Sequence, residues 1–361
     1  MLYFLSNFRE FFSFLNIFRY ITFRAGAAAF TSFFLCLILA PIFIRRFQKE
    51  DMKEGVDRDY CEELSKVQGY KKNTPSMGGI FVVASILISM VLWADLKNPY
   101  ILLTMLTCLW LAILGFIDDY LKIRQKGHRG LSSSTKLFWQ FILGSIIGYY
   151  ILFDSTITTR LDIPFLKSII LYLGVFYIPW AALIIMSCSN AVNLTDGLDG
   201  LAIGCVLFVG LGLGTLSYIS GNFKFAEYLL LPYIAGSGEL TVACAAIVGA
   251  SLGFLWFNCY PASIFMGDVG SLALGGTLGV IAIFIKKELL LIFLGGIFVW
   301  EALSVILQVA SMKIRGKRIF KMSPFHHHLQ LLGWNESKII IRFWIIAIIL
   351  ALLTLTTIKI R

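Results

Sequence analysis

Two adjacent aspartates, Asp118 and Asp119, follow the apolar run 101–117 and open the basic segment 120–136. Carboxylates at the edge of a long apolar run are costly unless a cation or a proton neutralises them. Similar aspartates lie beside three other apolar runs, so the chain offers a set of carboxylates for a shared divalent cation. Ligands that are all oxygen favour Mg²⁺, with Mn²⁺ as the alternative, over Zn²⁺. The further aspartates are Asp196, Asp199 and Asp268.

Helix capping is the competing explanation for a single aspartate. It suits Asp199, because an anion is favourable at the start of a helix. It suits Asp118 and Asp119 less well, because they are predicted to end a helix, where the dipole disfavours negative charge.

Three consecutive histidines, His326, His327 and His328, are the second chemical feature. Neighbouring side chains on a helix point about 100° apart, so the three rings cannot converge on one metal ion. Binding of a phosphate fits them better, and basic residues precede them in the chain. Upstream, Glu301 and Gln308 are seven residues apart in an apolar run, so one helix face is predicted to line the site or a lipid groove.

The elements that must position these residues are membrane spans. The chain has 361 residues, is 58% hydrophobic and 14% charged, and has a mean hydropathy of +0.82. A soluble domain of this length needs far more charged surface, and the alternating segments of a membrane β-barrel do not occur. We therefore predict an all-α polytopic integral membrane protein with about ten transmembrane helices. The expected spans are 23–44, 77–94, 99–117, 137–153, 168–189, 200–220, 240–259, 270–285, 289–311 and 339–358.

An even number of spans puts both termini on one side of the membrane. Most loop lysines and arginines follow odd-numbered spans, which predicts cytoplasmic loops there and periplasmic termini. The net charge of +10 thus reports topology, and no nucleic-acid partner is expected. Residues 1–21 show helical spacing of apolar side chains and predict an interfacial helix, with a frayed terminus as the alternative. Within one transmembrane domain, 1–361, the cytoplasmic loops that share the polar clusters are 45–76, 118–136, 190–199, 258–269 and 312–338.

A cation site ringed by lysines and histidines in an apolar protein suits one reaction class. It can join a water-soluble nucleotide-linked phosphate to a lipid phosphate, because the cations shield two phosphates that repel each other. A transporter with an intramembrane acidic pathway is the alternative. That alternative predicts carboxylates near the middle of the bilayer, whereas these lie at one face.

Five sequence motifs stand out: TPSMGG at 74–79, GFIDDYLK at 115–122, NAVNLTDGLDGLA at 190–202, FMGDVGS at 265–271 and KMSPFHHH at 321–328. With these motifs the chain resembles the phospho-N-acetylmuramoyl-pentapeptide transferase family, within the wider polyprenyl-phosphate hexose-1-phosphate transferase superfamily. The HHH segment, followed by GWNE at 333–336, is the signal most specific to this family. Two positions depart from its pattern: Gln330, where Glu is usual, and Ser76, where Thr is common.

The resemblance implies transfer of phospho-MurNAc-pentapeptide from UDP-MurNAc-pentapeptide to undecaprenyl phosphate, which gives lipid I and UMP. This is the first membrane step of peptidoglycan synthesis. It implies Mg²⁺ dependence, a homodimer, and a site at the cytoplasmic face of the bacterial inner membrane. A UDP-GlcNAc transferase is the nearest alternative, and direct and two-step mechanisms both stay open.

The resemblance also assigns roles. Asp268 is the implied Mg²⁺ ligand, Asp118 handles the lipid phosphate with Asp119 beside it, and His326 assists catalysis or binds phosphate. Phe265 is the implied stacking platform for uracil. The implied substrate-binding residues are Lys71, Ser76, Lys122, Lys126, Asn190, Asn193, Asp196, Asp199, Phe265, Gln308, His327 and His328.

Overall fold

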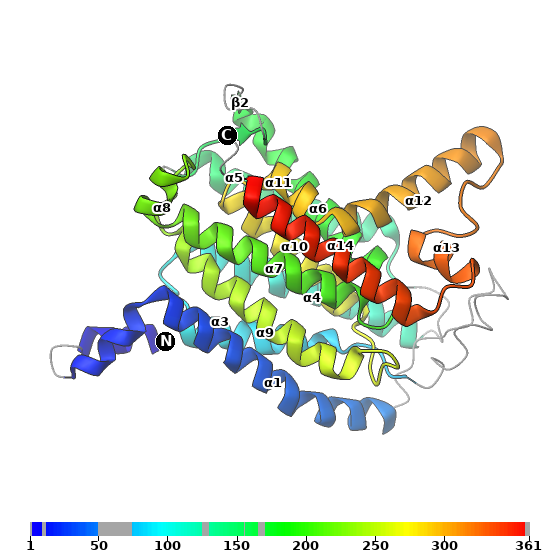
Figure 1. The fold of residues 1–361 in the computed structure, drawn as a ribbon, viewed down its shortest axis with the longest axis horizontal. Coiled ribbons are helices and arrows are strands. Elements are labelled where there is room, and N and C mark those ends of the chain that lie inside the picture. The colour runs from blue at the N-terminus through cyan, green and yellow to red at the C-terminus, as the bar shows by residue number, and fades with distance from the viewer. Residues whose placement is uncertain are drawn as a thin grey trace.

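The computed structural model describes residues 2–8, 12–49, 74–124, 130–154, 156–164 and 170–357. It is an all-helical bundle, as predicted (Figure 1). In the described part, nine helices are long and apolar enough to cross a membrane. The one remaining predicted span, 77–94, corresponds to α3, Gly79–Trp93. This helix is apolar but has only 15 residues.

The helices follow the predicted order of spans. Between the fourth and fifth spans, β1 pairs antiparallel with β2, with Leu161 opposite Leu171. The remaining elements are η1 Leu2–Phe8, η2 Ser13–Arg19, α1 Ile21–Lys49, α4 Pro99–Arg124, α5 Ser133–Phe153, β1 Arg160–Asp162, β2 Ile170–Tyr172, η4 Gly174–Phe176, α6 Tyr177–Thr195, α7 Leu201–Ser220, α8 Phe223–Tyr228, η5 Ser237–Glu239, α9 Leu240–Asn258, α10 Gly267–Phe284, α11 Glu288–Leu294, α12 Gly296–Arg315, α13 Phe325–Leu331 and α14 Glu336–Thr356.

Helix α10 forms the centre of the bundle and packs against α4 and α6. Almost all of its residues are buried. Glycines allow the close approach: a Cβ at Gly115 of α4 would lie 2.2 Å from the Asp268 carbonyl oxygen, and one at Gly275 would lie 2.4 Å from the Cys188 carbonyl oxygen. Small residues permit such helix contacts in membranes. The end of α4 is thereby held against the start of α10.

The ninth predicted span, 289–311, is wrong as a single helix. The structure breaks it at Gly295 into α11 and α12, and α12 diverges from the bundle (Figure 1). Adjacent glycines, Gly295 and Gly296, explain the break, because glycine is a poor helix former and sharp kinks gather at such residues.

The predicted interfacial helix at 1–21 is also wrong in its form. The described residues there make two short 3₁₀ helices, η1 and η2, instead of one continuous α-helix. Aromatic residues lose rotamer freedom in helices. Several rings here, such as those of Phe8, Phe12 and Phe14, are exposed, and others contact the bundle. Phe18 stacks on Trp93 at a centroid distance of 6.1 Å, and the Arg24 guanidinium lies 4.6 Å from the centre of the Tyr3 ring.

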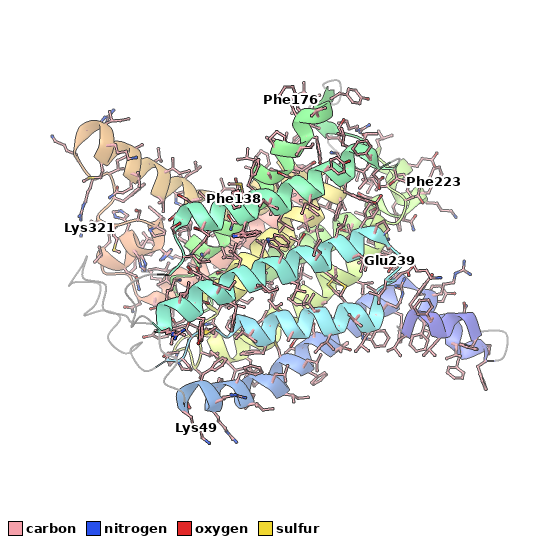
Figure 2. The ribbon with its side chains drawn as sticks, turned by 180° about the vertical axis from the view of Figure 1, so that it is seen from behind. Lys49, Phe138, Phe176, Phe223, Glu239 and Lys321 are labelled. Atoms are coloured by element: carbon pink, nitrogen blue, oxygen red, sulfur yellow. The ribbon has the colours of Figure 1, made fainter. Side chains whose placement is uncertain are left out.

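The two ends of the bundle differ in their loops. Figure 2 shows Lys49 and Lys321 at one end, and Phe176, Phe223 and Glu239 at the other. The start of α1 and the end of α14 both lie away from α13 (Figure 1), as an even number of spans requires. The polar motifs gather at the end that carries α13.

Candidate active site

Three buried carboxylates meet where α4 ends and α10 begins. Asp118 and Asp119 lie in the last two turns of α4, and Asp268 lies in the first turn of α10. Each offers a carboxylate oxygen, and these oxygens lie within 4.8 Å of one another. Their exposed fractions are 0%, 3% and 7%. A set of hard oxygen ligands this close fits Mg²⁺ or Mn²⁺.

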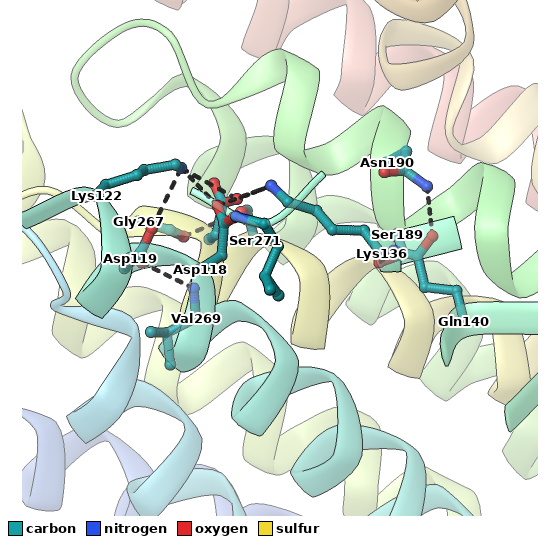
Figure 3. Close-up of polar contacts among 12 residues, drawn as sticks. Asp118, Asp119, Lys122, Lys136, Gln140, Ser189, Asn190, Gly267, Val269 and Ser271 are labelled. Atoms are coloured by element: carbon teal, nitrogen blue, oxygen red, sulfur yellow. Dashed lines mark hydrogen bonds and ion pairs between the residues drawn. The ribbon is translucent and has the colours of Figure 1, made fainter. Parts of the chain in front are cut away.

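Two lysines compensate the carboxylate charge. Lys122 Nζ lies 2.8 Å from Asp118 Oδ2 and 3.2 Å from Asp268 Oδ2. Lys136 Nζ, from the first turn of α5, lies 2.7 Å from both of the same oxygens. Figure 3 shows the two lysines reaching the carboxylates from opposite sides. Like charges this close need such cationic partners.

The sequence interpretation missed the role of Lys136, which it counted only as a loop charge. One signal was available: Lys136 begins an apolar run and lies four residues before Gln140, on the same helix face. The partner of Lys136 is far away in sequence, at Asp268, so no local pattern connects the two residues.

Backbone groups fix the orientation of the carboxylates. The Leu131 N–H donates to Asp118 Oδ1 at 2.6 Å, and the Val269 N–H donates to Asp119 Oδ2 at 3.2 Å. Gly267 has φ +74°, and a Cβ there would lie 2.4 Å from Asp119 Oδ2. A side chain at this position would therefore be strained and would also strike the carboxylate. Asp119 is thus held by the turn that begins α10.

The segment with Ser76 joins the same turn. The Phe265 N–H donates to the Pro75 carbonyl, and the Gly78 N–H donates to the Phe265 carbonyl, both at 2.8 Å. Ser76 is buried and Phe265 is half-buried. The first and fourth polar motifs are therefore paired through their backbones. Two predicted substrate residues, Lys71 and Lys126, lie outside the described residues.

The two ends of the motif 190–199 make different contacts, and Asn190 at its start contacts α5. Asn190 Nδ2 donates to Gln140 Oε1 at 2.8 Å, and Gln140 Nε2 donates to Ser189 Oγ at 3.1 Å. These bonds connect α6 to the helix that carries Lys136. Asn193, in the last turn of α6, and Asp196, at its C-cap, are both half-buried.

Asp199 holds a different loop in place. Its Oδ2 accepts a hydrogen bond from the Ala262 N–H at 3.0 Å, and its own N–H donates to Glu336 Oε1 at 2.9 Å. Asn258 Oδ1 accepts from the neighbouring Gly200 N–H at 2.9 Å. Asp199 therefore ties together the loops around 262 and 336, which is a structural role that capping alone did not anticipate.

The three histidines contact different groups, as the helical geometry predicted. The His326 ring is fully buried, with Nδ1 3.2 Å from Glu301 Oε2. His327 Nδ1 lies 2.9 Å from Gln330 Oε1. His328 Nδ1 accepts a hydrogen bond from the Lys321 N–H at 3.1 Å.

His326 also connects two motifs. A Cβ at Gly197 would lie 2.2 Å from His326 Nε2. The histidine helix is therefore packed against the turn 195–199, and only glycine leaves room for the ring. Glu301 anchors the same residue through its backbone, since the His326 N–H donates to Glu301 Oε1 at 3.2 Å.

Gln308 is engaged with backbone groups. Its Oε1 accepts from the N–H groups of Ile319 and Phe320 at 3.1 and 3.0 Å, and its Nε2 donates to the Phe320 carbonyl at 3.0 Å. These bonds use the side chain to shape the loop before α13. The structure thus shows a loop-fixing role for a residue that the resemblance assigned to substrate.

An apolar groove of about 570 Å³ begins beside this site. It runs along α6 from Trp180 to Leu194, between α6 and the pair α11 and α12. Leu137 and Asn190 line it at the end nearest the carboxylates, and Glu288 lines it at the α11 end. The lining of the groove is mostly apolar and includes Leu137, the residue that follows Lys136 of the cluster.

The comparisons with known proteins give the class of this helical membrane bundle, which is a phosphoglycosyl transferase. The family model for glycosyl transferase family 4 matches residues 100–286, which include all three carboxylates. Signature 1 of phospho-N-acetylmuramoyl-pentapeptide-transferase matches residues 71–83.

Curated relatives narrow the class. The chain is 50% identical over 360 residues to phospho-N-acetylmuramoyl-pentapeptide-transferase of Thermodesulfovibrio yellowstonii, covering 99% of each chain. It is 49% identical over 346 residues to that of Citrifermentans bemidjiense (96% of each chain), and 46% identical over 366 residues to that of Methylacidiphilum infernorum (100% of each). The chain belongs to the phospho-N-acetylmuramoyl-pentapeptide transferase family.

Proposed function

We propose that this enzyme transfers phospho-MurNAc-pentapeptide from UDP-MurNAc-pentapeptide to undecaprenyl phosphate, which gives lipid I and UMP. The observation that carries the proposal is the carboxylate and lysine cluster together with an apolar groove whose lining includes Leu137, the residue after Lys136. The groove suits a polyprenyl chain, and the cluster suits the phosphates that must meet beside it. The full-length match to relatives of that name supports the same reaction.

The reaction exchanges one phosphate bond for another. An oxygen of the lipid phosphate forms a bond to the phosphorus that carries the sugar, and the bond from that phosphorus to the bridging oxygen of the diphosphate breaks. UMP leaves with this oxygen. Positive charge near the three phosphates lowers their mutual repulsion and stabilises the charge that moves to the leaving group.

The carboxylates of Asp118, Asp119 and Asp268 are suited to hold Mg²⁺ together, which enlarges the metal set from Asp268 alone. A bound Mg²⁺ would supply Lewis-acid stabilisation of phosphate oxygens. Lys122 would offer a further cation to the diphosphate, and His326 is proposed to assist the phosphate chemistry. Phe265 remains the proposed stacking surface for uracil.

The membrane arrangement follows from the same proposal. The end of the bundle that carries α13 faces the cytoplasm, where nucleotide substrates occur, and both termini are periplasmic. The loops 45–76, 118–136, 190–199, 258–269 and 312–338 form the cytoplasmic site of one transmembrane domain in the bacterial inner membrane. The enzyme acts as a homodimer.

The test is a transfer assay with purified protein, undecaprenyl phosphate and Mg²⁺. UDP-MurNAc-pentapeptide should give lipid-extractable product and one UMP for each product formed. UDP-GlcNAc is the matched control and should give none. A lipid product from UDP-GlcNAc alone would overturn the assignment. Exchange of labelled UMP into the nucleotide substrate without lipid would favour a two-step mechanism through Asp118.

A further inference from the structure

Lys136 occupies the boundary between the carboxylate cluster and the apolar groove. Its Nζ lies 2.7 Å from Asp118 Oδ2 and 2.7 Å from Asp268 Oδ2. The next residue, Leu137, lines the groove. One turn further along α5, Gln140 binds Asn190, which lines the groove as well. Lys136 therefore reaches into the cluster from a helix whose neighbouring residue lines the groove.

Lys122 contacts the same oxygens from the other side. Its Nζ lies 2.8 Å from Asp118 Oδ2 and 3.2 Å from Asp268 Oδ2. In Figure 3, Lys136 approaches from the side of Gln140, Ser189 and Asn190, and Lys122 approaches from the opposite side. The two lysines therefore share the same acidic partners, but only Lys136 approaches them from the side of Asn190.

Charge limits how many cations these oxygens can serve. Three carboxylates and two ammonium groups leave one negative charge in the cluster. A divalent cation held by the same carboxylates changes this to one positive charge and competes with both lysines for the same oxygens. An ammonium group that loses a carboxylate partner in a mostly buried site needs another anion.

Resting on the proposed function, we propose that Lys136 is the ligand for the phosphate of the polyprenyl acceptor, and that metal binding releases it from the carboxylates for this role. A lipid phosphate that leaves the groove beside Leu137 and Asn190 meets Lys136 before any other described lysine of the cluster. The metal and the lipid acceptor thus bind cooperatively, through one ammonium group that exchanges carboxylate for phosphate.

The test is direct binding of a polyprenyl phosphate to the detergent-purified full-length protein by titration calorimetry, with and without Mg²⁺. In the wild type, Mg²⁺ should tighten the binding of the lipid. Lys136→Met should weaken lipid binding in Mg²⁺ by about 10-fold to 100-fold, the effect of one charged hydrogen bond. It should also reduce the tightening by Mg²⁺ below that of the wild type and make Mg²⁺ alone bind more tightly.

Lys122→Met is the matched control, because it removes an ammonium group from the same two oxygens. It should tighten Mg²⁺ binding as Lys136→Met does, and it should leave lipid affinity in saturating Mg²⁺ within about twofold. Equal loss of lipid affinity in both variants, or no loss in Lys136→Met, would overturn the proposal. Unfolding temperatures of both variants show whether each is folded.

Two further ligands identify the source of the phosphate. The matching polyprenol should bind with no dependence on Lys136, and inorganic phosphate should bind far more weakly than the lipid. Inorganic phosphate that binds as tightly as the lipid, with the same dependence on Lys136, would contradict a lipid subsite. If the wild type makes no lipid-linked product, the proposed function fails; if it makes product while Lys136→Met binds lipid normally, only this inference fails.

Discussion

The contact between Gly197 and His326 allows a sharp test of the histidine helix. A Cβ at Gly197 would lie 2.2 Å from His326 Nε2 and 3.0 Å from Cε1. The ring has no exposed surface, and its other side faces Glu301. Gly197→Ala therefore forces the ring or the turn to move, while the backbone at 197 needs no left-handed conformation.

Overpacking of a buried site costs about 1–3 kcal/mol. If His326 acts on the phosphates, displacement of its ring removes up to this much stabilisation from the transition state alone, and kcat should drop by roughly 5-fold to 150-fold. The assay measures kcat and both KM values for product formation, together with the unfolding temperature. Gly26→Ala is the control, because a Cβ at Gly26 meets nothing within 4 Å and should leave kcat unchanged.

The double variant Gly197→Ala/His326→Ala completes the design. Removal of the ring removes the clash, so the double variant should be as active as His326→Ala alone. A normal kcat in Gly197→Ala, with or without a lower unfolding temperature, would refute a role for the position of His326 in the reaction.

Three other substitutions probe supporting contacts. Gln330→Glu keeps an acceptor 2.9 Å from the His327 ring, so activity should stay within about threefold, whereas Gln330→Leu should cost about 1–3 kcal/mol in stability by thermal unfolding. Arg24→Met breaks a buried ion pair in which Arg24 Nη2 lies 2.5 Å from Glu239, and it should destabilise the protein by about 3–5 kcal/mol while the folded fraction keeps its kcat. Gln308→Ala removes three bonds to backbone groups and should increase proteolysis of the loop before α13; an unchanged cleavage pattern would contradict its loop-fixing role.

Much of the fold could be predicted from hydropathy, because each span must satisfy its own backbone in lipid and therefore appears as a long apolar run. The break at Gly295 was missed because hydropathy is continuous across it, and the pair of glycines at 295 and 296 was not interpreted as a helix break. The N-terminal segment was mispredicted because apolar spacing from residue 4 to residue 18 was equally compatible with two short 3₁₀ helices.

The sequence predicted the residues of the site better than the contacts between them. Loop parity brought the five motifs to one end, and the carboxylates of Asp118, Asp119 and Asp268 do meet there. Contacts between residues 130 or more positions apart depend on helix packing. The role of Lys136 as a partner of Asp268 was therefore not predicted. The same limit hid the loop-fixing bonds of Gln308.

The central claim is that Asp118, Asp119 and Asp268 hold one divalent ion at the point of transfer. Mn²⁺ substitutes for Mg²⁺ at oxygen sites and is visible by anomalous scattering. Crystals grown with Mn²⁺ should give one strong anomalous peak within ligand distance of these three carboxylates, and this peak should vanish in Asp268→Asn. A Mn²⁺ peak away from all three, in an enzyme that is active with Mn²⁺, would contradict the account.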